Sequence, residues 1–430
     1  MTKCMVGAAA LVLALGATTQ ISQAADNNDG LTLPKGFHAS VVHPGVGAGA
    51  RHIAVRANGD LFISSNPHKN VPHQGITVVR MGKDHKPIAT ERFAVGKVEG
   101  GTAIRFYKGA LYAATNKTIY RFTFNGNEMV PGAEPQVVVD GFPGTGHENL
   151  GLDFDGKGKM YVSVAGQGNI CNDPNVPKTS RAVGLMPCPQ LVGRAGVWTF
   201  DPTKMNQKFP ADGEQIATGV RDMMAVSWSH TLNGFYGVMQ DRNGTAHAFG
   251  DAVSEGADAD SIAEEMHRLD KGSNLGWPYS YYDMSQKARI LAPEYGGDGS
   301  KPIADGTTYN TPVVNFLAHS SPLDLQFYEA KQFPKEYRGG AFVVMHGGGG
   351  AGVLPTGYHG YNVQFVPVVN GKLGTPQPFA EGMAGPDASY KNGGKTLARP
   401  SGAAVAPDGS LYVVEEKKGK IWRISYDGKN

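Results

Sequence analysis

The chain has 430 residues, a formal net charge of +2 and 59 glycines. A chain so close to neutrality offers no broad basic field, which argues against a polyanionic partner such as nucleic acid or an anionic lipid surface. Glycine at about twice its ordinary frequency, without a sustained amphipathic helical repeat, predicts many tight turns between short strands.

The first 24 residues are typical of a secretory signal peptide. Lys3 precedes an apolar run from Met5 to about Ala17, and Ser22-Gln23-Ala24 places small residues at the positions before a cleavage site. The run is short for a membrane span, and an uncleaved anchor is the alternative. We therefore expect residues 1–24, with their cysteine, to be removed and the mature chain, 25–430, to be periplasmic or secreted.

One short phrase, in which one or two glycines precede an aromatic-containing strand, occurs six times. The copies are at 57–65, 107–115, 153–166, 232–240, 338–346 and 406–416. Their centres are 49 to 107 residues apart, whereas a four-stranded propeller blade needs about 40 to 50 residues. The spacing predicts an all-β, six-bladed propeller that forms a single domain, with insertions near 171–194 and 242–310.

Further strands and a ring closure follow from the same pattern. Alternating apolar and polar residues predict strands at 76–81, 118–124, 195–202 and 361–369. The segments 31–45 and 420–428 each hold a short strand, and we expect them to pair within one blade and close the ring. Two segments suggest helix: 261–272, which spaces Ile262, Met266 and Leu269 at helical intervals, and a single short turn at 332–337.

Two cysteines of the mature chain, Cys171 and Cys188, bracket an insertion rich in proline and asparagine. In an oxidising compartment this arrangement predicts a disulfide, which stabilises a loop of this size by about 3 kcal/mol in the chain-entropy model. Half of a zinc site is the alternative, although no CxxC or HxxxH motif accompanies the pair.

Three features could carry chemistry. His147, in the loop sequence GHENL, can accept a proton near neutral pH, although a histidine at the surface is the simpler interpretation. Arg221 precedes an apolar strand, where it needs a bound anion or an ion pair such as one with Asp222. The acidic stretch within 239–278 offers oxygen ligands for Ca²⁺, and a solvated acidic loop is the alternative.

A set of ordered motifs makes these features more specific. They are GHENLGLDFDGKGKMYVSVAGQGNIC, ATGVRDMMAVSW, MQDRN, KGSNLGWPY, AHSSPLDLQFY, EYRGGAFVVMHG and RPSGAAVAPDGSLYVVEE. In this order they resemble the glucose/sorbosone dehydrogenase family. Members of that family are soluble sugar dehydrogenases that use pyrroloquinoline quinone (PQQ) and Ca²⁺ on a six-bladed propeller.

The resemblance implies roles for individual residues. His147 matches the base that takes the proton of the sugar hydroxyl, and Arg221 matches the arginine at the quinone oxygens. Gln167 and Gln240 match positions that contact the cofactor, and Arg399 matches an arginine near its carboxylates. The backbone carbonyls of Asp241 and Arg242 match the ligands of the cofactor's calcium, and Glu264 and Glu265 match an acidic pair near a further calcium site.

The chain departs from the family pattern at Leu150, Asp222, Met223 and Ser401, where two or three positive charges around the tricarboxylate are absent. These departures motivate an alternative function, a non-redox propeller that binds a carbohydrate or a partner through a degenerate cofactor pocket. A calcium-dependent lactone hydrolase is a third possibility. The chain has no CxxCH haem motif, so a dehydrogenase would need a separate electron acceptor, a quinone or a cytochrome.

Overall fold

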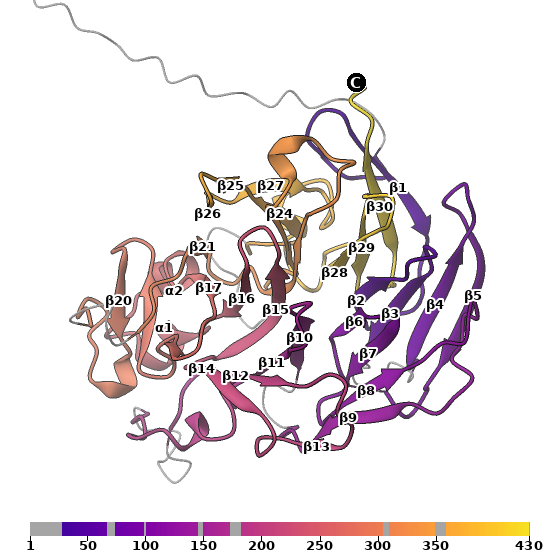
Figure 1. Ribbon diagram of the computed structural model, residues 1–430. Helices are drawn as coiled ribbons and strands as arrows, with labels where there is room; N and C mark the ends of the chain where they lie inside the picture. The colour runs from indigo at the N-terminus through magenta and orange to yellow at the C-terminus, as the bar shows by residue number, and fades with distance from the viewer. Residues whose placement is uncertain are drawn as a thin grey trace, which may run out of the picture.

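Six antiparallel sheets, arranged as blades around a common axis, contain most of the strands of the protein (Figure 1). The computed structural model describes residues 28–66, 74–98, 100–144, 149–172, 182–303, 309–348 and 358–429. The predicted all-β, six-bladed propeller is confirmed. The predicted signal peptide, 1–24, lies outside the described residues.

The blades follow one another in chain order, each from its inner to its outer strand. Blade 1 consists of β2 (Ala50–Val55), β3 (Leu61–Ser65), β4 (Ile76–Met81) and β5 (Pro87–Phe93), and blade 2 of β6 (Ile104–Tyr107), β7 (Ala110–Ala114), β8 (Thr118–Phe122) and β9 (Gln136–Asp140). Blade 3 consists of β10 (Leu150–Phe154), β11 (Met160–Val164), β12 (Gly196–Phe200) and β14 (Glu214–Thr218), and blade 4 of β15 (Asp222–Ser229), β16 (Gly234–Gln240), β17 (Glu264–Arg268) and β21 (Val314–Phe316). Blade 5 consists of β22 (Pro322–Phe327), β23 (Ala341–Met345), β24 (Asn362–Val366) and β27 (Gln377–Ala380), and blade 6 of β28 (Pro400–Val405), β29 (Leu411–Glu415), β30 (Ile421–Tyr426) and β1 (Phe37–His43).

Smaller elements decorate this ring. The short strands β13 (Gln207–Lys208) and β18 (Ser273–Asn274) extend blades 2 and 3 by parallel pairing. Among the described residues, two hairpins lie outside the blades, formed by β19 (Ser280–Asp283) with β20 (Ala288–Leu291) and by β25 (Val368–Val369) with β26 (Lys372–Leu373). Within the described ranges the helical elements are α1 (Thr245–Phe249), α2 (Glu255–Asp260) and the 3-10 turns η1 (Pro189–Leu191), η2 (Pro293–Tyr295), η3 (Lys335–Tyr337) and η4 (Ala388–Tyr390).

The repeated phrase of the sequence forms the second strand of every blade, namely β3, β7, β11, β16, β23 and β29. A second strand has sheet neighbours on both sides and packs against the adjacent blades with both faces. All five residues of β3 and of β23 are buried as a result. A turn precedes each strand, and Gly59 and Gly409 occupy the left-handed region there, at φ values of 91° and 86°. The repeat is therefore a signal of the fold, set by burial and by turn geometry.

The two ends of the chain close the ring. β1 pairs with β30 in an antiparallel register that runs from Phe37 opposite Tyr426 to His43 opposite Ile421, and the two strands lie side by side in Figure 1. Phe37 also packs edge-on against Phe333 and Phe379 of the neighbouring blade 5. The predicted closure by strands from both ends is confirmed.

The predicted helix at 261–272 is wrong, because this segment contains β17, the third strand of blade 4. Ile262, Met266 and Leu269, which are spaced at helical intervals, are all buried, but they are buried between strands. β17 pairs with β16 on one side and with β21 on the other, and these pairings override the local helical periodicity. The short turn predicted at 332–337 is present as η3.

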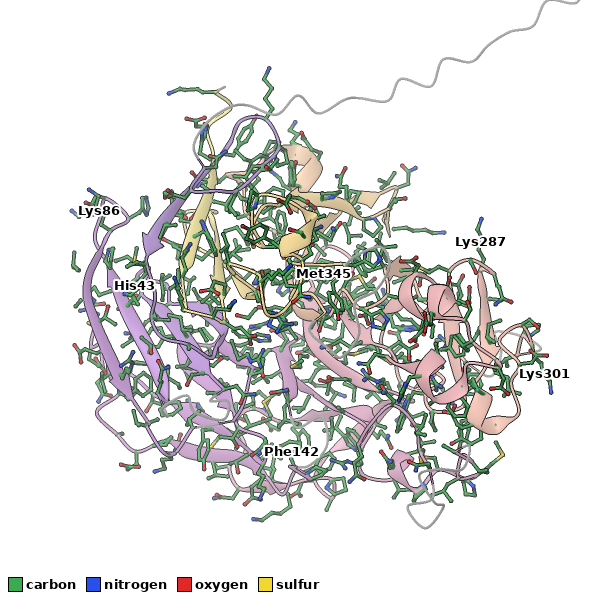
Figure 2. The ribbon with its side chains drawn as sticks, turned by 180° about the vertical axis from the view of Figure 1, so that it is seen from behind. His43, Lys86, Phe142, Lys287, Lys301 and Met345 are labelled. Atoms are coloured by element: carbon green, nitrogen blue, oxygen red, sulfur yellow. A yellow bond between two sulfur atoms is a disulfide. The ribbon has the colours of Figure 1, made fainter. Side chains whose placement is uncertain are left out.

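The first strands of the blades, which lie nearest the axis, contact one another around the ring in the order β2, β6, β10, β15, β22, β28 and again β2. We call the end at which these strands begin the first mouth and the end at which they finish the second mouth. Seen from behind in Figure 2, Lys86, Lys287 and Lys301 point outward from the rim, whereas the buried Met345 lies near the middle. No helix in the described part of the chain is both long enough and apolar enough to cross a membrane.

Candidate functional site

The first mouth brings together predicted site residues from three blades. Arg221 immediately precedes β15, and Gln240 ends the antiparallel β16, opposite Asp222 in the register. Gln167 follows the end of β11, and Arg399 immediately precedes β28. First strands begin and second strands end at this mouth, so the alternation of strand direction carries all four residues to the same end of the ring.

The guanidinium of Arg221 is buried and held by three hydrogen bonds. Its Nε and Nη2 donate to Oδ1 of Asn169 at 3.0 and 2.7 Å, and its Nη1 donates to the carbonyl of Gln240 at 3.1 Å. Burial lowers the pKa of Arg221, and the carboxylates of Asp222, Asp241 and Glu264 act in the opposite direction. The guanidinium is therefore held by Asn169 and Gln240, and Asp222, the partner that the sequence suggested, is one of three acids whose charge acts on it.

Asn169 is itself fixed from two sides. Its Nδ2 donates to the carbonyl and to Oδ1 of Asn243 at 2.9 and 3.0 Å, and its own carbonyl accepts from the indole Nε1 of Trp277 at 2.9 Å. Trp277 packs against Cys171 and Cys188 in a small buried cluster. These cysteines form the predicted disulfide, with Cα atoms 6.1 Å apart. The GWP motif of the sequence therefore supports the loop that carries Gln167 and Asn169.

The side-chain amide of Gln240 is held by the first loop of blade 5. Its Nε2 donates to the carbonyl of Pro322 at 3.2 Å, and Ser321 Oγ donates to its Oε1 at 3.1 Å. Glu264 joins the segment after β16 to the segment before β22. Its carboxylate accepts hydrogen bonds from the backbone N–H of Asp241 at 2.9 Å and of Ser321 at 3.1 Å. Burial raises the pKa of Glu264 to about 7, although both N–H groups act to lower it.

The other acidic candidate, Glu265, contacts a histidine and an arginine of the protein. Its Oε2 lies 2.9 Å from His267 Nε2 and also contacts the guanidinium of Arg289. Burial acts to raise the pKa of Glu265, but Arg289 and His267 outweigh it and lower the pKa to about 2. Burial, followed by the charge of Glu265, raises the pKa of Asp241 to about 8.

No group of three or more His, Cys, Asp or Glu side chains suited to a metal ion occurs in the described part of the chain. Arg242 pairs with Glu294, with Nη1 and Oε2 3.0 Å apart, so its side chain is also occupied. Glu264 and Glu265 serve protein donors, which leaves the backbone carbonyls of Asp241 and Arg242 as the candidate calcium ligands. Calcium binding therefore stays a prediction.

A second charged cluster lies at the first mouth in blades 6, 1 and 5. The carboxylate of Glu416 is within 3.0 Å of Arg51 Nη1, 3.0 Å of His346 Nε2 and 3.3 Å of Arg399 Nη1. Arg399 Nη2 also donates to the carbonyl of Gly347 at 2.6 Å. Burial lowers the pKa of His346 to about 4, although Glu416 acts to raise it. Because His346 is neutral above that value, Arg51 and Arg399 share the carboxylate of Glu416, and the charge of Asp222 also acts on Arg51.

The four residues at which the sequence departs from the family pattern have different structural environments. Leu150 and Met223 are buried in hydrophobic clusters between blades. Ser401 is fully buried and donates to the carbonyl of Ala50 at 3.0 Å. Asp222 is buried close enough to raise the pKa of Arg51, against the larger effect of burial. Arg51, which the sequence did not single out, thus brings a guanidinium to the mouth near Ser401.

The predicted base, His147, lies outside the described residues. The nearest described position is Asn149, directly before β10, whose Oδ1 accepts from Thr102 Oγ1 at 2.7 Å and from Asn66 Nδ2 at 3.0 Å. These bonds tie the start of blade 3 to blades 1 and 2. His147 as the base stays a prediction.

Comparison with known proteins extends over the whole ring. The model of the TrAA12-like family matches residues 31–427. The chain belongs to the TrAA12-like family.

Solved structures similar to the TrAA12-like chain have the same fold. The PQQ domain of pyranose dehydrogenase from Coprinopsis cinerea gives a TM-score of 0.70 at 16% identity, covering 92% of this chain and 97% of that chain. The calcium structure of a family AA12 carbohydrate-active enzyme from Trichoderma reesei gives 0.71 at 19% identity, covering 95% and 98%. At these identities the likeness establishes the fold.

Among curated proteins, a PQQ-dependent sugar dehydrogenase of Hypocrea jecorina is 24% identical over 254 residues, which are 53% of this chain and 54% of that protein. The TrAA12-like chain spans about half the length of the curated relatives it matches. The resemblance to PQQ-dependent sugar dehydrogenases that the motifs suggested is confirmed by these comparisons.

Sequence reasoning missed Asn169, Arg51 and Glu416 in the TrAA12-like chain. Asn169 lies two residues after Gln167, so the AGQGN motif contained it, but only the fold brings it to Arg221. Arg51 and Glu416 stand at the start of β2 and just after β29. Their position at the end of a blade strand could have marked Arg51 and Glu416 as candidate site residues. His346, which directly follows β23, has the same kind of position.

A cavity of about 600 Å³ lies in blade 5 beside β27, on the side of the first mouth, where Thr32, Tyr361, Glu381 and Asp387 are among its lining residues. None of the predicted site residues in the described part of the TrAA12-like chain lines it. We therefore place the candidate site where the charged groups converge at the first mouth, and this cavity is beside it, with the ring of Tyr361 5.8 Å from the guanidinium of Arg399.

Proposed function

We propose that the chain is a periplasmic dehydrogenase that uses PQQ and Ca²⁺ and oxidises an aldose, a sorbosone-like aldehyde or a related alcohol. The observation that carries this proposal is the convergence of Arg221, Gln167, Gln240 and Arg399 at one mouth of the ring. The names of the relatives, a PQQ-dependent sugar dehydrogenase and a pyranose dehydrogenase PQQ domain, support it.

The donor set fits a flat tricarboxylate. Carboxylates are held most strongly by guanidinium groups, and Arg51 and Arg399 provide two of these beside a single glutamate. Nε of Arg399 is buried and has no hydrogen-bond partner among the described residues. We assign Arg51 and Arg399 to the carboxylates of the cofactor, and Arg221 with the amides of Gln167 and Gln240 to its quinone edge.

When bound, PQQ supplies a quinone that accepts hydride, and Ca²⁺ supplies a Lewis acid. The protein supplies the remaining chemistry. Arg221 presents donors of fixed orientation where negative charge develops, in a buried setting that strengthens them. His147 takes the proton of the substrate hydroxyl, a role that rests on its sequence position and on the pKa range of an imidazole.

We place the calcium at the backbone carbonyls of Asp241 and Arg242, next to Gln240. Burial raises the pKa values of Asp241 and Glu264 to about 8 and about 7, and a bound cation would favour the ionised forms of both groups. We assign Glu264 and Glu265 to holding the loop, because both carboxylates already accept bonds from protein groups. The existence of a calcium structure of the similar Trichoderma reesei enzyme supports calcium as the cation.

The location and the acceptor complete the proposal. A buried disulfide and a predicted signal peptide favour an oxidising compartment, the periplasm or the exterior of the cell. We expect electrons to leave to a separate quinone or cytochrome, because the sequence has no haem attachment motif.

A reconstitution experiment tests the proposal. Purified protein is titrated with PQQ in the presence of Ca²⁺ and followed by quenching of tryptophan fluorescence, and dye reduction is then measured over a panel of sugars and aldehydes. We expect PQQ to bind at micromolar or lower concentration and at least one substrate to be turned over. Absence of PQQ binding would remove the proposal, and stabilisation by a sugar without any response to PQQ would favour the non-redox binding propeller.

The variant His147→Ala separates binding from chemistry. We expect it to bind PQQ as the unmodified protein does and to lose about 10²- to 10⁴-fold in turnover, the usual contribution of a general base. Normal turnover in this variant would remove His147 from the mechanism while leaving the cofactor assignment in place.

A further inference from the structure

The side chain of Asn169 can hold Arg221 in one orientation only. A guanidinium has donors and no acceptor, so the oxygen of the amide must face Arg221 and the NH₂ group must face away. The NH₂ group then meets two acceptors, the carbonyl and Oδ1 of Asn243, at 2.9 and 3.0 Å. Both halves of the amide have matched partners, which excludes the flipped arrangement.

The contacts leave Arg221 with donors to spare. Arginine has five N–H groups, and the bonds from Nε and Nη2 to Asn169 and from Nη1 to Gln240 use one on each nitrogen. One N–H on Nη1 and one on Nη2 therefore remain for an oxygen from outside this set of contacts. Because the guanidinium is planar, fixing its Nε edge against Asn169 also sets the direction of the remaining donors.

Asn169 is anchored independently of Arg221. The indole Nε1 of Trp277 donates to its carbonyl at 2.9 Å, and the ring of Trp277 lies so close to Gly166 that an added Cβ there would be 2.7 Å from it. Gly166 N in turn donates to the carbonyl of Arg221 at 2.7 Å. The short segment from Gly166 to Asn169 thus forms hydrogen bonds with both the backbone and the side chain of Arg221.

We infer that Asn169 is the positioning residue of Arg221, and that it holds the guanidinium so that two N–H groups face a negatively charged oxygen of the ligand at the first mouth. Asn169 does not touch the reacting atoms in this scheme. It acts through Arg221, and its consequence for catalysis rests on the proposed function. The holding of Arg221 itself is a property of the protein without cofactor.

The first experiment uses the protein without cofactor and reads Arg221 directly. In ¹⁵N-arginine-labelled protein, the Nε–H resonance of Arg221 is assigned by its loss in Arg221→Lys, and its exchange with water is measured. We expect slow exchange in the unmodified protein, exchange about tenfold faster in Asn169→Ala, and retained protection in Asn169→Asp, which keeps the acceptor oxygen and gains a charge-assisted contact with Arg221 that offsets the lost NH₂ bonds to Asn243. Equal exchange in Asn169→Ala and the unmodified protein would overturn the inference.

The second experiment measures PQQ affinity in the same variants by fluorescence quenching. We expect Asn169→Ala to bind PQQ about tenfold more weakly, and Asn169→Asp to bind more weakly as well, because its carboxylate neutralises the guanidinium that it still holds. Weak binding together with retained Nε–H protection in the aspartate variant is a pattern that general loss of structure does not produce. PQQ binding by Asn169→Ala as tight as that of the unmodified protein would overturn the inference.

Matched variants complete the design. Asn127, at the second mouth, also engages another asparagine, since its Oδ1 accepts from Asn58 Nδ2, and we expect Asn127→Ala to leave both readouts unchanged. If Asn169→Ala does not fold, Asn243→Ala removes one of the two acceptors of the Asn169 NH₂ group, and faster Arg221 exchange is expected there too. Failure of the unmodified protein to bind PQQ would remove the proposed function, while the exchange measurement would still decide the role of Asn169.

Discussion

Arg105 and Asp324, which are 219 positions apart in the sequence, form a buried ion pair near the axis of the propeller, with Nη2 and Oδ1 2.6 Å apart. The other oxygen of Asp324 accepts from the backbone N–H of Ala403 at 2.9 Å. Asp324 thus joins the inner strands of blades 2, 5 and 6 beneath the candidate site. Both side chains are almost completely removed from solvent.

We expect Asp324→Asn to lower the free energy of unfolding by about 3–5 kcal/mol, because it leaves the guanidinium of Arg105 buried without its countercharge. Urea denaturation followed by circular dichroism measures this change. The double variant Arg105→Met with Asp324→Leu removes both charges and should recover much of the loss. A single variant as stable as the unmodified protein would show that the axial charge is not desolvated.

The buried His52, which lies beside Asp324, should make the free energy of unfolding depend on pH. Its Nε2 donates to the carbonyl of Leu323 at 2.7 Å, and burial lowers its pKa from 6.5 to about 4, with Asp324 acting to raise it and Arg105 and Arg51 to lower it. Between these values the unfolded chain binds a proton that the folded protein does not. Stability from this group is therefore fully present above about pH 6.5 and is lost as the pH falls towards 4, by up to about 3 kcal/mol.

The test is the slope of unfolding free energy against pH, measured from pH 4 to 7 in urea. His52→Gln, whose amide can still donate to Leu323, should show a shallower slope in this window, and the comparison removes the contribution of carboxylates common to both proteins. Parallel slopes would mean that His52 titrates normally in the folded state.

Removal of the disulfide should destabilise the protein moderately. Cys171 and Cys188 are separated by 17 positions and are buried against Trp277. The double variant Cys171→Ser with Cys188→Ser should lose about 3 kcal/mol, measured as a shift of the urea midpoint at unchanged slope. A reducing agent added to the unmodified protein should approach the same midpoint only slowly, because both sulfur atoms are shielded from solvent.

Arg51 and Arg399 should both contribute to cofactor affinity if the proposed function holds. We expect Arg51→Gln and Arg399→Gln each to weaken PQQ binding by about ten- to a hundredfold, the range for losing one charge-assisted hydrogen bond. Arg56→Gln is the control, because Arg56 follows the same strand as Arg51 but donates to carbonyls at the second mouth. If Arg399→Gln weakens PQQ binding and Arg51→Gln does not, Arg51 pairs with Glu416 without contributing to the binding of the cofactor.

Local signals predicted the architecture well. The glycine turns and the short apolar strands after them located the second strand of each blade, and the terminal segments 31–45 and 420–428 were correctly expected to pair. The helix predicted at 261–272 failed because the environment of β17 is set by β16 and β21, which are distant in the sequence. β17 also contains two buried acids, Glu264 and Glu265, which the local sequence does not lead one to expect in a buried strand. Partners in other segments of the chain stabilise both carboxylates there.

The sequence by itself determined the number of blades, the closure of the ring, the disulfide and the presence of Arg221, Gln167, Gln240 and Arg399 in strand-edge positions. Turn geometry and strand alternation are local properties, so a single chain displays them. Only the tertiary structure decided that Asn169 faces Arg221 and that Arg51 shares Glu416 with Arg399. These contacts join different blades, or strands and loops far apart in the chain, and their geometry depends on the register and closure of the whole ring, which no short stretch of sequence encodes.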